Sequence, residues 1–570
     1  MSSVPNSPLP RAQRLAALAS QSFDLLVIGG GITGCGVARD AALRGLRVAL
    51  VEREDFGSGT SSRSSRLIHG GLRYLEHGHL RLVFEASTER RLLLKLAPHL
   101  VRPLAFTWPV YKGSRVPRWK LNAGLMLYDA LALFRNVKGH AGLSAKKVSE
   151  QEPRLRKDGL TGGARYYDAA TDDARLTSAN ALGAAAAGAT VVNHAQVTGL
   201  LFAGEKACGA QVLDTLTGKT VKVSARAVVN ASGPWSDEIR RLDRGEASTA
   251  LVRGSKGVHL AVPRERIGNK EALTLLSSVD GRVYFVLPSG PHAIIGTTET
   301  ATSAHPAEVR ANESDVAYLL ASANAFFPEA KLTRQDVISA WAGIRPLAAS
   351  GYDDNGGANS ASREHVVSVS RSGVVGISGG KLTTYRVMAA DVVDAVERSL
   401  ALPHREPTTD QIPLPGGDFT SVEVEQAAAL EALGDPDLAD TAGHLVASYG
   451  RDWRAVLALT QERPELALPI VEELPYLCAE AVYAARFELA ETLADILIRR
   501  TKIAFQTRDM GQAAAAELAP LLASTLGWSE AEVTLQVDRY RTDAERIFRI
   551  DPPEAKTAAA NEDAPQRAAS

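Results

Sequence analysis

The sequence is poor in cysteine, with three in 570 residues. Cys35, Cys208 and Cys478 lie far apart and form neither a CxxC motif nor the Cys/His spacing of a zinc site. This pattern excludes a disulfide framework and indicates no metal site. Scarce, unpaired cysteines are typical of a reducing compartment, so we expect a cytoplasmic protein.

The chain also lacks an excess of either charge, because 64 Lys and Arg face 65 Asp and Glu. Without a global positive field we expect no nucleic-acid partner. The N-terminal residues contain no long apolar stretch, and no later segment reaches about 18 uninterrupted apolar residues. Neither secretion nor a membrane-spanning helix is therefore expected.

The composition, 45% hydrophobic and 23% charged, is that of an ordinary globular protein. At roughly 100–200 residues per domain, a chain of this length is too long for one core. A Pro- and Gly-rich stretch near residue 405 precedes a region with helical spacing of Ala, Leu, Glu and Arg. We expect a flexible leader or short helix over 1–20, a first unit over 21–404, a helical domain over 405–550 and a disordered tail over 551–570.

A glycine-rich turn follows the first apolar run of the sequence. Residues 23–28 (FDLLVI) predict a buried parallel strand, residues 34–44 a helix and residues 45–52 a second strand. The turn between the first strand and the helix reads GGGITG over 29–34, and Glu52 ends the second strand. This order of elements is typical of the doubly wound α/β fold.

Each glycine of this GxGxxG motif has a physical role. Gly29 permits the tight turn, Gly31 lets the backbone approach a pyrophosphate, and Gly34 lets helix and strand pack closely. The helix N-terminus presents free N–H groups to phosphates, and Glu52 can accept hydrogen bonds from ribose hydroxyls. The motif predicts a dinucleotide site and leaves NAD and FAD both open.

Two further groups of strands are expected. The first group covers residues 189–193, 206–213 and 225–230. The second lies between 255 and 350, where the runs VHLAV, RVYFVL and HAIIGT are separated by Pro and Gly. Such spacing favours an antiparallel sheet, which we expect to cover the substrate.

Residues 57–76 (GSGTSSRSSRLIHGGLRYLE) resemble the signature of the FAD-dependent glycerol-3-phosphate dehydrogenases. The resemblance runs from about residue 20 to about residue 549. Further matching segments follow in order at 228–239, 253–263, 294–300, 342–347, 362–367, 373–386 and 474–501. The resemblance implies an α/β fold with a doubly wound FAD-binding domain of the glutathione-reductase or D-amino-acid-oxidase type. The resemblance also implies an antiparallel β-sheet substrate domain, formed mainly by about 100–165 and 255–340 and interleaved with the discontinuous FAD-binding domain. A C-terminal all-α domain follows.

The resemblance also implies FAD as the cofactor. The Ser-rich run at 61–65 would let hydroxyl groups approach the phosphates and ribityl chain of a flavin. The turn at 231–234 would lie beside the cofactor, and N–H groups near 379–383 would stabilise negative charge on a reduced flavin. A surface loop, an ordinary turn and a helix cap are the respective alternatives. The expected cofactor-binding residues are Gly29, Gly31, Gly34, Glu52, Thr60, Ser61, Ser65, His69, Gly70, Gly71, Leu72, Val197, Ala231, Gly233, Gly380, Lys381, Leu382 and Thr383.

The substrate implied by the resemblance is sn-glycerol 3-phosphate, whose phosphate dianion needs cations and whose alcohol needs a hydride acceptor. The expected substrate-binding residues are Arg73, Tyr74, Arg345, Arg363, Lys381 and Thr383. His69, Arg345 and Lys381 are the expected catalytic residues. His69 is the first candidate for the base, with a hydrogen bond to the flavin as its other role. Lys256 and His259 rank lower, as an exposed residue and a satisfied strand residue.

In the resembled family the electrons pass to membrane quinone, so we expect peripheral contact with the cytoplasmic face of the inner membrane. Residues 102–138 are the candidate segment, with seven basic residues against the single acid Asp129. Phe106, Trp108, Tyr111, Trp119 and the apolar run LNAGLMLYDALALF are interleaved with them. A basic segment packed entirely within the protein is the alternative. The helical domain carries no motif that assigns it a role, and contacts of a homodimer are one candidate.

Three other enzyme types and one binding function compete with this interpretation. A glycerol-3-phosphate oxidase would use oxygen and produce hydrogen peroxide, and the motifs separate it poorly from a dehydrogenase. An amino-acid oxidase would not need the whole signature at 57–76, and an NAD-dependent dehydrogenase would share only the first strand–helix–strand unit. A catalytically silent binding protein would be expected to lose some substrate cations, whereas all are present.

Overall fold

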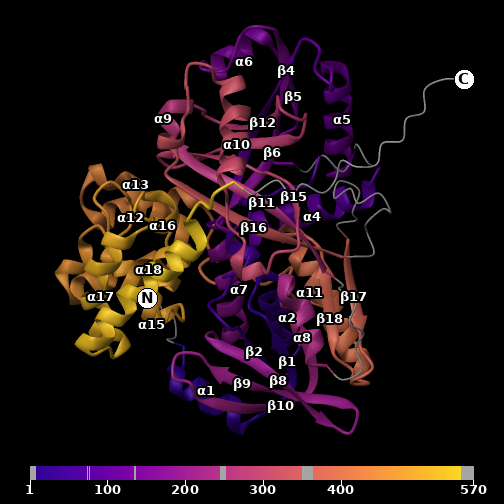
Figure 1. The fold of residues 1–570 in the computed structure, drawn as a ribbon, viewed down its shortest axis with the longest axis vertical. Helices are drawn as coiled ribbons and strands as arrows, with labels where there is room; N and C mark the ends of the chain where they lie inside the picture. The colour runs from indigo at the N-terminus through magenta and orange to yellow at the C-terminus, as the bar shows by residue number, and fades with distance from the viewer. Residues whose placement is uncertain are drawn as a thin grey trace, which may run out of the picture.

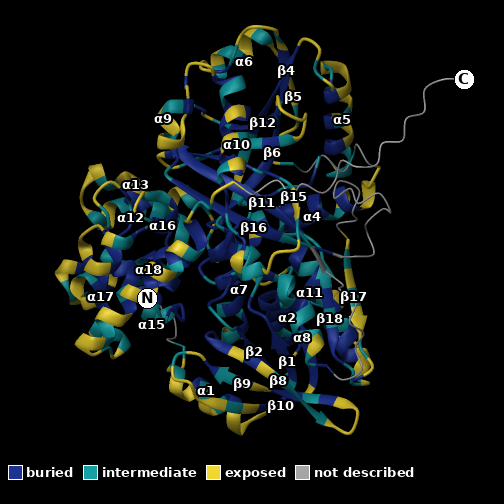
Figure 2. Ribbon diagram, in the orientation of Figure 1, coloured by how far each residue is buried: buried dark blue, intermediate teal, exposed yellow. Residues whose placement is uncertain are grey.

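The computed structural model describes residues 8–72, 75, 78–133, 136–243, 252–348 and 364–553. Figure 1 shows an α/β unit at the bottom, a second sheet with its helices at the top and a helical unit at one side. Both sheets are largely buried, and exposed residues gather on the outer faces of the helices (Figure 2).

The lower sheet is parallel at its centre. Among the described residues it contains, in order, β17 His365–Val369, β18 Val375–Gly379, β10 Thr220–Asn230, β1 Ser22–Ile28, β2 Val48–Val51 and β7 Thr190–Val192, with β9 Lys206–Asp214 on β10 and β8 Ala195–Ala203 on β9. The pairs β1–β10, β1–β2, β2–β7 and β10–β18 are parallel. The strands expected at 23–28, 45–52, 189–193, 206–213 and 225–230 are confirmed, with β10 longer than expected.

Helices cover this sheet on both faces, which explains the continuous apolar run of β1. Leu25 and Val27 share a core with α2 (Ile32–Leu43) and α11 (Tyr385–Ser399). Leu26 and Ile28 pack with Leu18 of α1 (Arg11–Ser20) on the other face. The helix α2 also contacts α7 (Asp173–Ala186). The doubly wound fold is confirmed.

The upper sheet is mainly antiparallel. Among the described residues it contains, in order, β15 Thr300–Thr302, β11 Val252–Pro263, β14 His292–Gly296, β13 Val283–Ser289, β12 Ala272–Leu276, β4 Val101–Tyr111, β6 Leu160–Thr171 and β3 Leu67–Ile68, with β16 Ser339–Ala348 on β11 and β5 Ala141–Ser144 on β6. The pair β12–β4 is parallel and the other pairs are antiparallel. The expected antiparallel sheet is thus confirmed, with one parallel pair that the sequence did not indicate.

The remaining helices surround these sheets or form the C-terminal domain. Those of the first two units are α4 Leu80–Leu96, α5 Arg118–Leu131, α6 Ala145–Gln151, α8 Ser236–Arg241, α9 Arg264–Ile267 and α10 Glu313–Phe326. Those beyond residue 405 are α12 Val422–Leu433, α13 Ala439–Tyr449, α14 Trp453–Glu462, α15 Cys478–Phe487, the π-helix η10 Asp495–Arg500, α16 Ile503–Gln506, α17 Gln512–Leu526 and α18 Glu530–Phe548. Short 3₁₀ turns occur at η1 Thr60–Ser62, η2 Gly233–Trp235, η3 Pro306–Glu308, η4 Arg334–Asp336, η6 Leu382–Thr384, η7 Pro436–Leu438, η8 Gly450–Asp452 and η9 Pro464–Ala467.

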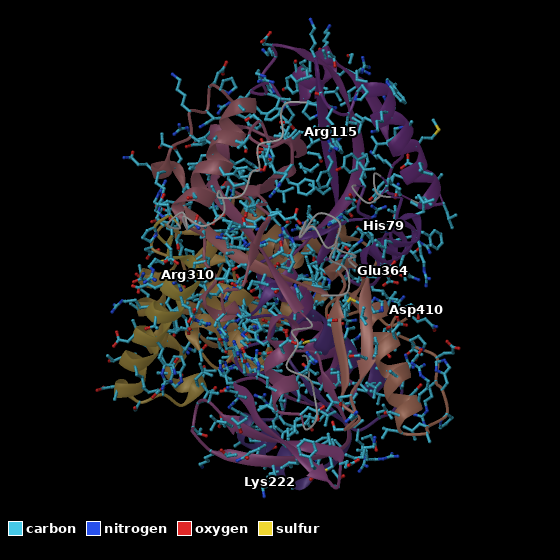
Figure 3. All side chains as sticks on the ribbon, turned by 45° about the vertical axis from the view of Figure 1, so that its right-hand side comes forward. His79, Arg115, Lys222, Arg310, Glu364 and Asp410 are labelled. Atoms are coloured by element: carbon cyan, nitrogen blue, oxygen red, sulfur yellow. The ribbon has the colours of Figure 1, made fainter. Side chains whose placement is uncertain are left out.

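After α18 the chain returns to the upper sheet. The Arg310 guanidinium, labelled in Figure 3, lies 2.9 Å from the Asp551 carboxylate. The Asp551 N–H also donates to the Ala311 carbonyl oxygen at 2.9 Å. Residues 554–570, most of the expected tail, lie outside the described residues.

The start of the chain differs from the expected flexible leader. Arg11–Ser20 form α1, so the short-helix alternative holds for these residues. Leu18 is fully buried. The Arg14 guanidinium lies 2.7 Å from Glu491, and the Arg11 guanidinium lies 2.7 Å from Asp214. The flexible leader was the wrong description here because these long-range ion pairs and the buried leucine hold the helix in place.

Candidate functional site

A cavity of about 710 Å³ lies between the two sheets. It begins at the turn between β1 and α2, follows residues 58–65 and ends among His69, Arg345 and Lys381. Its walls therefore come from the glycine turn, the Ser-rich loop and both sheets. Most of the described residues expected to bind a cofactor, and all the described ones expected to bind a substrate, border the same space.

The glycine turn has the geometry that a dinucleotide site requires. Gly29 has φ +109°, a left-handed conformation that favours glycine. A Cβ on Gly34 would overlap the Gly29 carbonyl oxygen, so helix and strand pack closely only with glycine there. A Cβ on Gly31 would meet only Ser61 Oγ, at 3.4 Å, and Gly31 borders the cavity. The roles expected for Gly29 and Gly34 are therefore visible in the backbone.

Glu52 holds this turn as well as lining the cavity. Its carboxylate accepts hydrogen bonds from the N–H groups of Gly30 at 2.6 Å and Glu54 at 2.9 Å. Burial raises the pKa of Glu52, and these two N–H donors oppose that shift. Each carboxylate oxygen keeps a further lone pair that a ribose hydroxyl could use, and the expected contact with ribose stays a prediction.

The Ser-rich loop is fixed by hydrogen bonds to three different elements. Ser61 Oγ accepts the N–H of Ile32, in the first turn of α2, at 3.0 Å. Thr60 Oγ1 donates to the Ile344 carbonyl oxygen at 2.6 Å. Ser65 Oγ and His259 Nε2 lie 2.9 Å apart. The surface-loop alternative therefore does not describe this segment, which lies between the two sheets.

One end of the cavity is lined by residues that suit an adenine and ribose. Val197, Ala231 and Gly233 line it, as expected. Sequence reasoning missed Arg53 and Trp235, whose guanidinium and ring lie 4.2 Å apart. The sequence held a signal for Trp235, because it directly follows the turn at 231–234.

At the other end Arg345 and Lys381 line the cavity together. The Arg345 guanidinium on β16 donates to Thr297 Oγ1 at 3.1 Å. It crosses Gly257 of the paired strand β11, where a Cβ would come within 2.6 Å of Arg345 Nη2. Sequence reasoning missed this role of Gly257, which depends on strand register.

The segment 379–383 turns sharply into the cavity before α11. Gly379 and Gly380 have φ +76° and +85°. Gly380, Lys381, Leu382 and Thr383 all line the cavity. Thr383 Oγ1 lies 3.3 Å from both the N and the O of His69, which connects this turn to the end of β3. The expected helix opening is a 3₁₀ turn, η6, that leads into α11.

Two imidazoles, His69 and His259, line the cavity among the described residues. The His259 ring stacks on Trp341 with 5.5 Å between centroids and 14° between planes. Burial lowers the pKa of His259 to about 3, with smaller contributions from the Arg345 and Arg66 cations. His259 is therefore neutral at pH 7. The sequence predicted a satisfied strand residue, whereas the structure places its ring in the cavity wall.

Several expected site residues do not border the cavity or cannot be placed. Gly34 and Gly70 are absent from its lining. The Gly70 N–H donates to Tyr128 Oη at 2.9 Å and to Oδ1 of Asp168, which lines the cavity, at 3.2 Å. Gly34 has the packing role expected from the motif, and cofactor contact by Gly70 stays a prediction. Arg73, Tyr74 and Arg363 lie outside the described residues, whereas the other expected site residues, His69, Gly71, Leu72 and Ser65 among them, line the cavity.

An apolar extension of the cavity reaches α5. It is lined by Leu72, Leu75, Phe106, Trp108, Val116, Leu121, Gly124 and Leu127. On the outer face of α5, Trp119 is 73% exposed and Met126 is 61% exposed. Phe106, Trp108 and Tyr111 of β4 are buried. The segment 102–138 is therefore divided between a strand packed within the protein and a helix with exposed apolar side chains.

No described helix is both long enough and apolar enough to cross a lipid bilayer. The basic residues around α5 include Arg115, labelled in Figure 3 near the top of the molecule, and Arg118 and Lys120. Asp129, the acid of the segment, is buried and accepts the His140 N–H at 2.9 Å. The outer side of α5 thus combines basic and exposed apolar residues.

Comparison with known proteins gives two family matches. Residues 24–386 match the model of FAD dependent oxidoreductases, and residues 407–533 match the C-terminal domain of alpha-glycerophosphate oxidase.

Individual relatives cover almost the whole chain. The glycerol-3-phosphate dehydrogenase 2 of Mycobacterium tuberculosis is 42% identical over 561 residues, which are 96% of this chain and 93% of that protein. The glycerol-3-phosphate dehydrogenase of Synechocystis is 38% identical, over 92% of this chain and 96% of that protein. The X-ray structure of the glycerol-3-phosphate dehydrogenase from Bacillus halodurans complexed with FAD has a TM-score of 0.77 and 32% identity. It covers 94% of this chain and 97% of that one.

Proposed function

The chain belongs to the family of FAD-dependent glycerol-3-phosphate dehydrogenases, and on that premise we propose that it oxidises sn-glycerol 3-phosphate to dihydroxyacetone phosphate with membrane quinone as the electron acceptor. FAD is its cofactor. The observation that carries the proposal is the convergence of Arg345, Lys381 and His69 at one end of the cavity whose other end holds the dinucleotide motif.

The residues present fit FAD. The N-terminus of α2 presents its N–H groups at the glycine turn, where a pyrophosphate is favoured. Val197 and the turn at 231–233 would hold the adenosine half, Ser61 would lie near the phosphates, and Gly380 to Thr383 would border the ring. When bound, FAD supplies the acceptor for the hydride of the carbinol carbon and passes the two electrons to the second substrate.

Two cations would bind the phosphate and orient the alcohol. A guanidinium fork such as that of Arg345 can contact two oxygens at once, whereas an ammonium such as that of Lys381 acts as a point charge. Thr383 adds a hydroxyl at the same end of the cavity. Arg73, Tyr74 and Arg363, expected at this site from the sequence, complete the proposed binding set.

We assign the removal of the hydroxyl proton to His69. Imidazole is the side chain that most often acts as a general base, and His69 lines the same cavity as Arg345 and Lys381. His259 lines the same cavity, but its lowered pKa makes it a weak base, suited to a neutral hydrogen bond. Arg345 and Lys381 would stabilise the negative charge that develops on the substrate oxygen.

The apolar extension beside α5 supports quinone as the second substrate. Its lining of leucines and aromatic rings suits a lipid-soluble ring better than a polar acceptor. The exposed Trp119 and Met126, with the basic residues around them, suit peripheral contact with an anionic bilayer, which for this protein would be the cytoplasmic face of the inner membrane. A homodimer built through the helical domain remains part of this proposal. A glycerol-3-phosphate oxidase that transfers the electrons to oxygen is the alternative, and the C-terminal family match carries that name.

An anaerobic titration tests the proposal. Glycerol 3-phosphate is added to the purified holoprotein while the visible flavin bands are recorded, with sn-glycerol 1-phosphate as the control. We expect bleaching by the first compound only, then rapid recovery with a soluble quinone and slow recovery with air. Rapid recovery with air and formation of hydrogen peroxide would favour the oxidase, and a flavin that glycerol 3-phosphate does not bleach would refute the substrate.

A further inference from the structure

The C-terminal helical domain lies behind one wall of the FAD cavity without lining it. Glu52, Arg53, residues 58–61 and residues 63–65 border the cavity, whereas no described residue beyond 405 does. The helices α15 to α18 stand beside the lower and upper sheets in Figure 1. Any influence of this domain on the cofactor must therefore pass through the residues that it contacts.

The first contact is a buried ion-pair cluster on Asp55. The Asp55 carboxylate accepts hydrogen bonds from Arg499 Nε at 2.7 Å and from Arg500 Nη1 and Nη2 at 2.7 and 3.0 Å. All three side chains are buried. One residue earlier, Glu54 pairs with Arg546 of α18 at 2.9 Å. Two successive acids, which directly follow the cavity-lining Glu52 and Arg53, thus meet three cations of the C-terminal domain.

The second contact reaches the Ser-rich loop through one intermediate. Lys502 Nζ lies 3.0 Å from Asp172 and 3.5 Å from Asp173. The other carboxylate oxygen of Asp173 accepts the N–H and the Oγ–H of Ser64, at 3.0 and 2.7 Å. Because Ser64 lines the cavity, a single carboxylate separates the Lys502 ammonium from the wall.

The third contact is a series of aromatic rings. Phe505 meets Trp341 edge to face, with 5.1 Å between centroids and 89° between planes. Trp341 stacks on His259, and His259 Nε2 lies 2.9 Å from Ser65 Oγ. Phe548 supports Phe505 from behind at 4.8 Å. The orientation of the His259 ring therefore depends on two residues of the C-terminal domain.

We propose that the C-terminal helical domain is a positioning part of the FAD site. Arg499, Arg500 and Lys502 fix the backbone of residues 54–64, and Phe505 fixes the ring of His259 through Trp341. Breaking one partner of a buried ion pair leaves an uncompensated charge, which displaces the groups around it. The inference rests on FAD as the cofactor and is independent of the substrate and the electron acceptor.

The test uses the full-length protein with its FAD removed and then restored. Lys502→Met removes the ammonium but keeps an unbranched stem, and Lys502→Arg restores the charge. The matched control is Arg486→Met, which breaks the exposed pair with Glu462 in the same domain. We expect FAD to bind Lys502→Met at least tenfold more weakly, with altered visible circular dichroism of the bound flavin. Lys502→Arg should bind within threefold of the parent protein, and the control within twofold.

A second pair of variants covers the case in which Lys502→Met does not fold. Phe505→Leu removes the ring that meets Trp341, and the control Phe487→Leu removes a ring that packs on Tyr483 of the same domain. We expect at least threefold weaker FAD binding and altered flavin circular dichroism for Phe505→Leu only. A folded Lys502→Met or Phe505→Leu protein with unchanged FAD affinity and circular dichroism would overturn the inference. Neither measurement uses glycerol 3-phosphate, so failure of the proposed function would not affect this test.

Discussion

The close approach of Arg345 to Gly257 predicts that one added methyl group displaces the guanidinium and impairs the reaction. In Gly257→Ala the new Cβ would lie 2.6 Å from Arg345 Nη2 and 2.7 Å from Thr297 Oγ1. Ordinary van der Waals contact begins near 3.4 Å, so the guanidinium must move by about 0.8 Å. A misplacement of about 1 Å in a positioned group can cost about 100-fold in rate. We therefore expect kcat/KM for glycerol 3-phosphate to fall about 10- to 100-fold, equal to about 1.4–2.7 kcal/mol.

The assay is steady-state reduction of a soluble quinone with the variant and a control. Gly199→Ala is the matched control, because it adds the same methyl group to a strand glycine whose nearest neighbour, Gln211 Oε1, lies 4.0 Å away. FAD content and thermal midpoint are measured on both variants. A folded, FAD-loaded Gly257→Ala protein with the kcat/KM of the parent would refute a substrate role for the position of Arg345.

Two further predictions concern the outside of the cavity. Burial raises the pKa of Glu152 from 4.5 to about 7. The folded protein therefore favours the protonated carboxyl, and its stability falls as pH rises from about 4.5 to about 7. Glu152→Gln should therefore be about 1–3 kcal/mol more stable than the parent at pH 8 and equal to it near pH 4.5, measured by denaturant unfolding; an equal difference at both pH values would contradict this. On α5, the double variant Trp119→Ser and Met126→Ser should bind vesicles of phosphatidylglycerol and phosphatidylcholine at least tenfold more weakly, while Val424→Ser, 65% exposed on α12, binds them as the parent does. Equal sedimentation of all three proteins with the vesicles would argue against α5 as the membrane contact.

The dinucleotide unit could be predicted from the sequence because its determinants are local. A buried strand, a turn with Gly29 and Gly31, a helix and Glu52 follow one another within 30 residues. Each residue type there meets a need of the local backbone: a positive φ, a close approach of helix to strand, or a hydrogen-bond acceptor for a buried N–H group. The same locality explains why the strand ranges of the lower sheet were close to those observed.

Contacts between distant segments were the part that the sequence did not reveal. His259 was expected to be a satisfied strand residue. Its lowered pKa results from burial beside Trp341, a contact that the sequence does not show. The hydrogen bonds from the Gly70 N–H to Tyr128 and Asp168 were likewise not visible in the sequence, because the partners lie 58 and 98 positions away. Periodicity and spacing describe one segment at a time and contain no information about such pairings.

In the C-terminal domain a segment could be recognised from the sequence, but its structural role could not. The run IRRT at 498–501 was part of a segment similar to the dehydrogenase family, yet nothing around it indicated a role. Arg499 and Arg500 acquire one only beside Asp55, more than 440 positions earlier in the chain. Burying two guanidinium groups is costly unless each meets a carboxylate with good geometry. Asp55 lies shortly before the Ser-rich loop, so its ion pairs connect the helical domain to the backbone of the FAD site. A substitution that destabilises the helical domain should therefore also weaken FAD binding.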